Sequence, residues 1–135
     1  IMDNSPKLVN FTMLPKAPTL SVSMSSLNQK CLNGKNASSQ SFEIWNSGSG
    51  SFTYVITDDV EWLSVSPSSG SSTGDHDVVQ VNYDTSGLSA GTYYGKITLK
   101  ANEVGILESP QTITVTLRVS EAGMTWMQLL LDGDK

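Results

Sequence analysis

The sequence of 135 residues is poor in cysteine, in charge and in long hydrophobic runs. Its single cysteine, Cys31, excludes an internal disulfide, and its single histidine, His76, leaves little for nucleophilic chemistry. Only 16% of the residues are charged and the formal net charge is −5. With Arg118 as the one arginine, the sequence indicates no basic stripe and therefore no nucleic-acid partner. No apolar run approaches the roughly 18 residues of a membrane helix, so membrane insertion is not expected.

Hydroxyl side chains take the place of charge on this chain. There are 21 serines and 12 threonines, a composition typical of secreted bacterial β-proteins. The length suits one domain with its own hydrophobic core. We therefore expect an extracellular or cell-surface location. No export signal is visible, but because the chain begins at Ile1 we interpret it as a processed or excised piece, so the missing signal says little about its compartment.

Apolar and polar residues alternate with a period of two in short segments separated by turn residues, which is the pattern of half-buried strands. Seven strands are expected, at about residues 19–25, 41–46, 52–56, 62–66, 79–83, 93–100 and 112–119. The polar stretch 28–39 has room for a short extra edge segment, and 67–75 is expected to be a loop. No helical period occurs between Thr19 and Val119. The chain therefore predicts an all-β fold, an antiparallel β-sandwich of about seven strands.

Two segments carry the strongest family signal. The first runs from Trp62-Leu63 through Val65 to Pro67 and Gly70, and the second runs from Asp84 through Gly87 to Gly91 and Tyr93. Over about residues 19–119 these segments resemble the BACON-type modules of bacteria. The loop at 102–109 and the tail beyond Ser120 lie outside this resemblance.

The resemblance implies an immunoglobulin-like sandwich that serves as an accessory unit of secreted or surface proteins, often beside glycoside hydrolases or proteases. The family's name implies carbohydrate binding, whereas its motif residues read as structural, and a spacer role is an equal alternative. No cofactor and no catalytic role are implied.

Each motif residue has a structural interpretation that needs no ligand. Trp62 is expected to plug the open end of the sandwich. We expect Pro67 and Gly70 to bracket a turn, and Asp84 to cap the bend at Ser86 or Gly87. The remaining motif residues, Gly91 and Tyr93, lead into the sixth strand.

Outward-facing aromatic residues are the better candidates for recognition. Trp45 and Tyr94 have the alternation expected of exposed rings, on which a sugar ring would stack, and we expect them to lie in different sheets. Covering by a neighbouring segment is the competing interpretation of Trp45. Near His76, the two flanking carboxylates and nearby serines suggest a triad, but no nucleophile elbow accompanies them.

Acidic residues in two loops also raise the question of calcium. The first loop carries Asp58, Asp59 and Glu61, and the second carries Asp75 and Asp77. Since calcium takes six or more oxygen ligands and neither loop has EF-hand spacing, a solvated acidic rim is the favoured interpretation and no metal site is expected.

The ends of the chain complete the division into segments. Residues 1–18 are expected to be an extended linker or lead-in, 19–119 the sandwich, and 120–135 a tail or the start of a following segment. The apolar stretches 8–14 and 124–131 allow pairing with neighbouring domains or with copies of the chain. Three hypotheses follow: a non-catalytic spacer or adhesion unit of an exported bacterial protein, a carbohydrate-binding module, and a subunit that assembles by strand addition.

Overall fold

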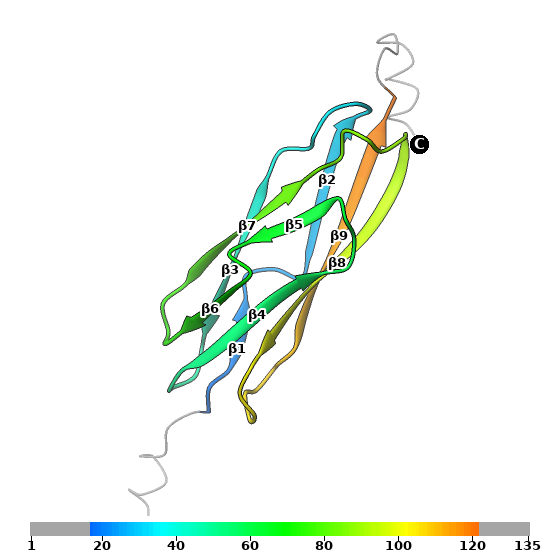
Figure 1. Cartoon of the computed structure of the whole chain (residues 1–135). Helices are drawn as coiled ribbons and strands as arrows, with labels where there is room; N and C mark the ends of the chain where they lie inside the picture. Colours follow the sequence, from blue (N-terminus) through cyan, green and yellow to red (C-terminus); the bar gives the residue numbers. More distant parts are fainter. Residues whose placement is uncertain (1–16, 122–135) are drawn as a thin grey trace, which may run out of the picture.

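The computed structural model describes residues 17–121, which form a β-sandwich of two sheets (Figure 1). The strands are β1 (Leu20–Val22), β2 (Ser26–Leu32), β3 (Gln40–Asn46), β4 (Phe52–Asp58), β5 (Leu63–Ser66), β6 (Ser69–Ser72), β7 (Asp77–Tyr83), β8 (Gly91–Ala101) and β9 (Gln111–Ser120). One sheet has the strand order β1-β3-β7-β5, and the other has the order β2-β9-β8-β4-β6. The predicted all-β sandwich is confirmed.

The number of strands and one pairing differ from the prediction. Nine strands are present in the described part of the chain, and the two that were not among the predicted seven are β2 and β6. Strand β2 pairs in parallel with β9, whereas every other strand pair is antiparallel. Both extra strands are edge strands of the larger sheet. Polar edge strands such as these are held by backbone hydrogen bonds, so they lack the apolar alternation that a sequence pattern detects.

The core lies between the inner faces of the two sheets. Its buried side chains are those that the alternation placed inward, because successive residues of a strand point to opposite faces. The largest fully buried ones are Tyr54, Phe42, Phe52, Leu20, Ile44, Ile97, Leu99, Ile113, Leu117, Val79, Val81 and Val115. At about 1.5–3 kcal/mol for each fully buried large apolar side chain, this layer is the main source of the fold's stability.

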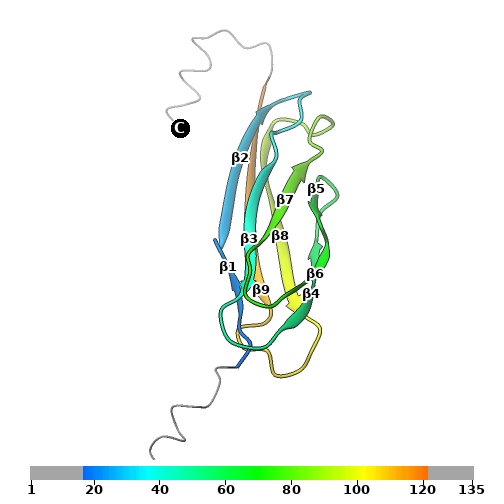
Figure 2. The ribbon, with the colours of Figure 1, turned by 90° about the vertical axis from the view of Figure 1, so that its left-hand side faces the viewer.

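The sandwich is elongated, and its long strands follow the long axis (Figures 1 and 2). Strand β8 has 11 residues and therefore spans roughly 36 Å at ~3.3 Å per residue. The described chain enters beside β1 at one end and leaves after β9 at the opposite end, as both views show. A chain segment on either side of this module would therefore be held about the length of the sandwich apart.

The loop between β8 and β9, which the family resemblance left unexplained, is attached to the beginning of the first strand. Leu107 accepts a backbone hydrogen bond from Leu20 at 2.9 Å and donates one to Pro18 at 2.9 Å. Thr19 and Leu107 form an isolated parallel bridge. These bonds fix the entering chain against the end of the sandwich. Among residues 17–121 there is no helix with the length and apolarity needed to cross a membrane.

Candidate functional site

Trp62 lies in the core, as predicted, and forms the centre of an aromatic cluster. It is only 9% exposed. Its ring stacks on Tyr83 with centroids 6.4 Å apart and meets Tyr93 edge-on at the same separation. On the inner face of β8, two residues after Tyr93, a Cβ added at Gly95 would come within 2.9 Å of Val60 and 3.4 Å of Trp62. The indole is thus enclosed by its neighbours, and its role is to pack the end of the sandwich.

The bend after β7 is held by a residue that the sequence analysis did not single out. The side-chain oxygen of Asn36 accepts hydrogen bonds from the backbone amides of Thr85 and Ser86, both at 2.9 Å. The buried Thr85 hydroxyl in turn donates to the carbonyl of Lys35 at 2.9 Å. Asn36 therefore fills the capping role that we expected of Asp84. Because Asn36 and Thr85 are 49 residues apart, no local sequence pattern could have predicted this contact.

Gly70 lies within β6, as the second residue after the connection of residues 67 and 68 that joins β5 to β6. Gly70 pairs with Tyr54 of β4, and a Cβ added there would lie 2.6 Å from the Tyr54 hydroxyl. That hydroxyl donates a 2.7 Å hydrogen bond to Asp77. Burial, followed by the effect of Asp77, raises the pKa of Tyr54 above its ordinary value. Gly70 is thus required by close packing of the tyrosine.

The turn between β3 and β4 has a buried polar centre. Asn46 is 3% exposed, and its side-chain oxygen accepts from the amides of Thr19 and Gly48, both at 2.9 Å. Its amide nitrogen donates to the carbonyl of Gly50 at 2.9 Å. Because its side-chain oxygen and nitrogen both have partners, its burial costs little. This residue also has a structural task.

Trp45 lies on the outer face of the smaller sheet, and one of its faces is covered. The ring of His76 stacks on it with centroids 4.1 Å apart and planes 8° from parallel. Nδ1 of His76 lies 2.7 Å from Oε1 of Glu43, the next outward residue on β3. The only histidine is therefore engaged by a tryptophan and a glutamate, and its Nδ1 is committed to Glu43 rather than to a serine.

The acidic loops do not converge in the described part of the chain. Among residues 17–121, no group of three or more His, Cys, Asp or Glu side chains is placed to hold a metal ion. Burial raises the pKa of Asp58, with the charge of Asp59 as the smaller cause.

Outside these two loops, hydrogen bonds from Thr53 lower the pKa of Glu103.

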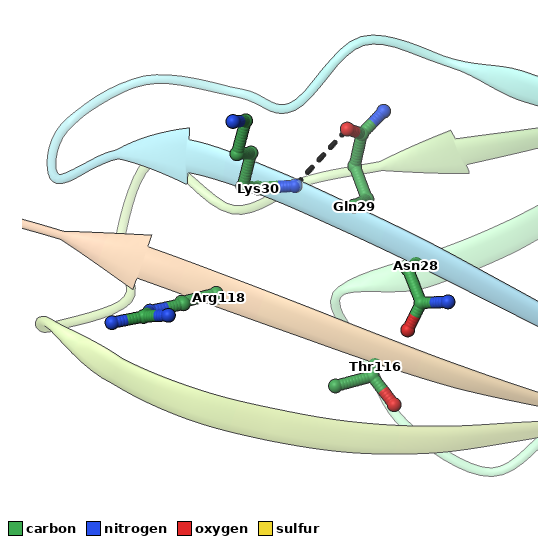
Figure 3. A pocket seen from close by; sticks show the side chains of 5 residues that line it. All are labelled: Asn28, Gln29, Lys30, Thr116 and Arg118. Carbon is green, nitrogen blue, oxygen red and sulfur yellow. Dashed lines mark hydrogen bonds between the residues drawn. The ribbon is translucent and has the colours of Figure 1, made fainter. Parts of the chain in front are cut away.

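Tyr94 lies on the outer face of the larger sheet, so the two predicted aromatic residues are on different sheets, as expected. It is 72% exposed. Beside it the strand pairing aligns Asn28 of β2, Thr116 of β9 and Tyr94 in one row. A hollow of about 410 Å³ opens next to this row, lined by Asn28, Gln29, Lys30, Thr116 and Arg118 (Figure 3).

Basic side chains gather on this same outer face, a feature that the sequence analysis missed. The face carries Lys30, Lys96, Lys100 and Arg118, all of them exposed. They come from β2, β8 and β9, strands that are adjacent in the sheet but far apart in sequence. We call this surface, together with Tyr94, the basic face. The alternation of each strand gave the outward direction of these residues, but only the pairing of the strands brings them together.

Comparison with known proteins agrees with this architecture. A family model described as viral BACON domain matches residues 19–120. A search of curated proteins gives no match.

Three solved structures show the same fold at low sequence identity. The PapD-like domain 7 of human CEP192 has a TM-score of 0.62 at 14% identity, with 82% of this chain and 91% of that chain covered. A putative carbohydrate binding protein from Bacteroides ovatus gives 0.61 at 12% identity, over 76% of this chain but 37% of that one. The CsuC-CsuE chaperone–tip adhesion subunit complex of Acinetobacter baumannii gives 0.61 at 9%, over 85% and 65%. The immunoglobulin-like fold that the resemblance implied is thereby confirmed.

Proposed function

The chain belongs to the viral BACON domain family, and from this membership we propose that it is a non-catalytic immunoglobulin-like module, a spacer or adhesion unit exposed outside the cell. Because the family is described as viral, we include viral proteins beside exported bacterial proteins as carriers of this module. In this proposal residues 19–119 are the module, 1–18 a lead-in linker, and 120–135 a tail or the start of a following segment.

One observation carries the spacer role: the described chain enters and leaves the sandwich at opposite ends of its long axis (Figure 1). A module with this geometry sets a fixed separation of roughly 36 Å along its long strands. The family motif supports the same role, because Trp62 and Gly70 are used for packing.

The spacer role is tested by replacement within the protein that carries the module. We expect a short flexible linker in place of residues 19–119 to impair attachment or reach of the carrier. An unrelated β-sandwich of the same length, entered and left at opposite ends, should restore the reach. Equal performance of the carrier with the short linker would refute spacing as the function.

Carbohydrate binding is the second candidate, and the exposure of Tyr94 favours it. A ring that is 72% exposed is available for stacking, whereas His76 occupies one face of Trp45. Tyr94 is therefore the stronger of the two predicted ligand residues. The similarity to a putative carbohydrate binding protein is a likeness of fold and supports this candidate only to that extent.

Assembly by strand addition is the third candidate. The apolar stretches on which it rests, 8–14 and 124–131, lie outside the described residues. Within the sandwich, β1, β5, β2 and β6 are the edge strands to which another strand would add. Sedimentation of the full chain and of a chain truncated after residue 121 tests this candidate, which requires that truncation lower the oligomeric state.

A further inference from the structure

The basic face is a concentration of positive charge on a protein whose overall charge is negative. Residues 17–121 contain five lysine and arginine residues, and four of them lie on this one face. Lys35, the fifth, lies in the turn after β2. The formal net charge of the chain is −5, so this concentration of positive charge runs against the composition.

These basic side chains are not neutralised within the described part of the chain. No lysine or arginine there forms an ion pair, and the one acid–base contact, between His76 and Glu43, belongs to the other sheet. Asp59 borders the face, where its Oδ1 accepts the backbone amide of Lys96 at 2.8 Å. The ammonium and guanidinium groups therefore keep their charge available for a partner.

The register of β2, β9 and β8 arranges the face in rows. Lys30 pairs with Arg118, which pairs with Thr92, and Tyr94 belongs to the next row with Thr116. The row after that holds Lys96 and Thr114, and Lys100 lies two further rows along β8. Since outward residues on a strand are roughly 6.6 Å apart, the basic residues extend over about 26 Å with Tyr94 among them.

The neutral groups between the charges suit a sugar. Tyr94 offers an open ring face, and the rows around it supply hydroxyl and amide groups from Asn28, Thr114 and Thr116. Two hollows flank the middle row. One, of about 410 Å³, has Lys30 and Arg118 among the residues that line it (Figure 3). The other, of about 240 Å³, is lined by Asp59, Tyr94, Gly95, Lys96, Thr114 and Val115. An aromatic ring beside hydroxyl and amide donors is the combination that stacks on and hydrogen-bonds to a polar ring.

We propose that the basic face binds an acidic polysaccharide, stacking one sugar ring on Tyr94 while Lys30 with Arg118 and Lys96 contact carboxylate or sulfate groups on either side. The spacing of the charges favours this occupant over nucleic acid. Duplex DNA carries one charge per ~1.7 Å, whereas four cations over about 26 Å match a sparsely charged chain. The acidic polysaccharide would be the ligand of the proposed adhesion unit, and the extracellular location of this binding rests on that proposed function.

The test is affinity electrophoresis of the full 135-residue chain in native gels that contain polygalacturonate, heparin or neutral dextran. We expect retardation by an acidic polymer and none by dextran. Polygalacturonate carries carboxylates only, whereas heparin carries both carboxylates and sulfates, so retardation by heparin alone would identify sulfate as the recognised group. Raising the salt concentration should weaken the retardation, because screening reduces the attraction of exposed charges.

Matched variants separate the basic face from the net charge. Lys30→Glu and Arg118→Glu should each weaken binding roughly tenfold, whereas Lys35→Glu makes the same change in net charge away from the face and should have little effect. Tyr94→Ala should weaken binding by a similar factor, and Tyr94→Phe, which keeps the ring face, should not. Circular dichroism of each variant checks that the sandwich is intact.

Several results would overturn the inference. One is no retardation of the folded chain by either acidic polymer. Others are a Lys35→Glu variant that binds as weakly as Lys30→Glu, or a Tyr94→Ala variant that binds as tightly as the wild type. Tighter binding of the chain to duplex DNA or to anionic lipid vesicles than to the polysaccharides would also overturn it. Because these measurements use the purified chain, failure here leaves the result of the spacer replacement unaffected.

Discussion

The hydroxyl of Tyr54 on β4 donates a 2.7 Å hydrogen bond to Oδ2 of Asp77 on β7, and this bond joins the two sheets. The tyrosine is 1% exposed. Its partner is a carboxylate, and a hydrogen bond to a charged group contributes more than one between neutral groups. The sandwich is therefore held at this point by a directional contact as well as by apolar packing.

Tyr54→Phe removes this hydrogen bond and keeps the ring. We expect the free energy of unfolding to fall by about 1–2 kcal/mol, measured by urea denaturation at neutral pH. Tyr94→Phe, an equal change on an exposed residue, should alter it by less than about 0.5 kcal/mol. Equal effects of the two variants would show that the contact between the sheets contributes nothing.

Gly70→Ala tests the close packing of β6 against Tyr54. The new Cβ would lie 2.6 Å from the hydroxyl of a fixed, buried ring, so the ring or the edge strand has to move. We expect a loss of about 1–3 kcal/mol in the free energy of unfolding. Gly87→Ala is the matched control, since nothing lies within 4 Å of its added Cβ. If Gly70→Ala were as stable as the wild type, β6 would be able to move away from Tyr54 without loss of stability.

Asn36→Ala tests which residue caps the bend after β7. The substitution removes the acceptor of two backbone amides, those of Thr85 and Ser86. We expect a loss of about 1–2 kcal/mol in unfolding free energy, against less than about 0.5 kcal/mol for Asp84→Ala. The reverse order would restore Asp84 to the capping role that the sequence suggested.

Trp62 and Trp45 should differ in their contribution to stability. Trp62→Ala empties a site enclosed by Tyr83, Tyr93 and neighbouring aliphatic residues, and we expect it to cost about 3–5 kcal/mol. Trp45→Ala removes a surface ring stacked on His76 and should cost less than about 2 kcal/mol. Chemical denaturation of both variants measures the difference, and similar costs would contradict the assignment of Trp62 to the core.

Alkaline pH should weaken the fold in part through Tyr83. Burial raises its pKa from 10.0 to about 12, and its hydroxyl donates to Gln40 at 2.5 Å. The neutral form is thus favoured in the folded chain. Its contribution to stability is complete below pH 10 and is lost as the pH rises through about 12, because the unfolded chain ionises first.

Urea denaturation of the wild type and of Tyr83→Phe across this range measures the effect. The stability of the variant should fall less steeply with pH than that of the wild type. Parallel curves would show that Tyr83 ionises equally in the two states.

Most of the fold was predictable because, in the longer apolar strands, the alternation of apolar and polar residues shows which face is buried. Phe42 and Ile44 of β3, and Ile97 and Leu99 of β8, are buried as the period of two predicted. Strand β2 was expected only as a short extra edge segment, since its sequence from Ser26 has one buried apolar residue, Leu27. Its strand form comes from the hydrogen bonds of its parallel pairing with β9.

The candidate site was predictable only in part. Alternation placed Tyr94 outward, and the structure agrees. Covering of Trp45 by a neighbouring segment was one of the two interpretations of that residue, but the sequence did not indicate that His76 would be the covering residue. The contact joins the segment before β7 to β3 through their pairing, which is non-local. The basic residues around Tyr94 were each visible in the sequence, yet nothing local connects Lys30 with Arg118.

The sequence by itself determined the class of fold and the inward and outward faces of the main strands. These properties depend on neighbours within a few residues, and the alternation of side chains along a strand expresses them directly. The tertiary structure alone decided which outward residues share a surface. Strand order and register bring together segments 80 or more residues apart, such as Lys30 and Arg118, and so create the basic face, because pairing is settled by the whole sheet rather than by any one strand.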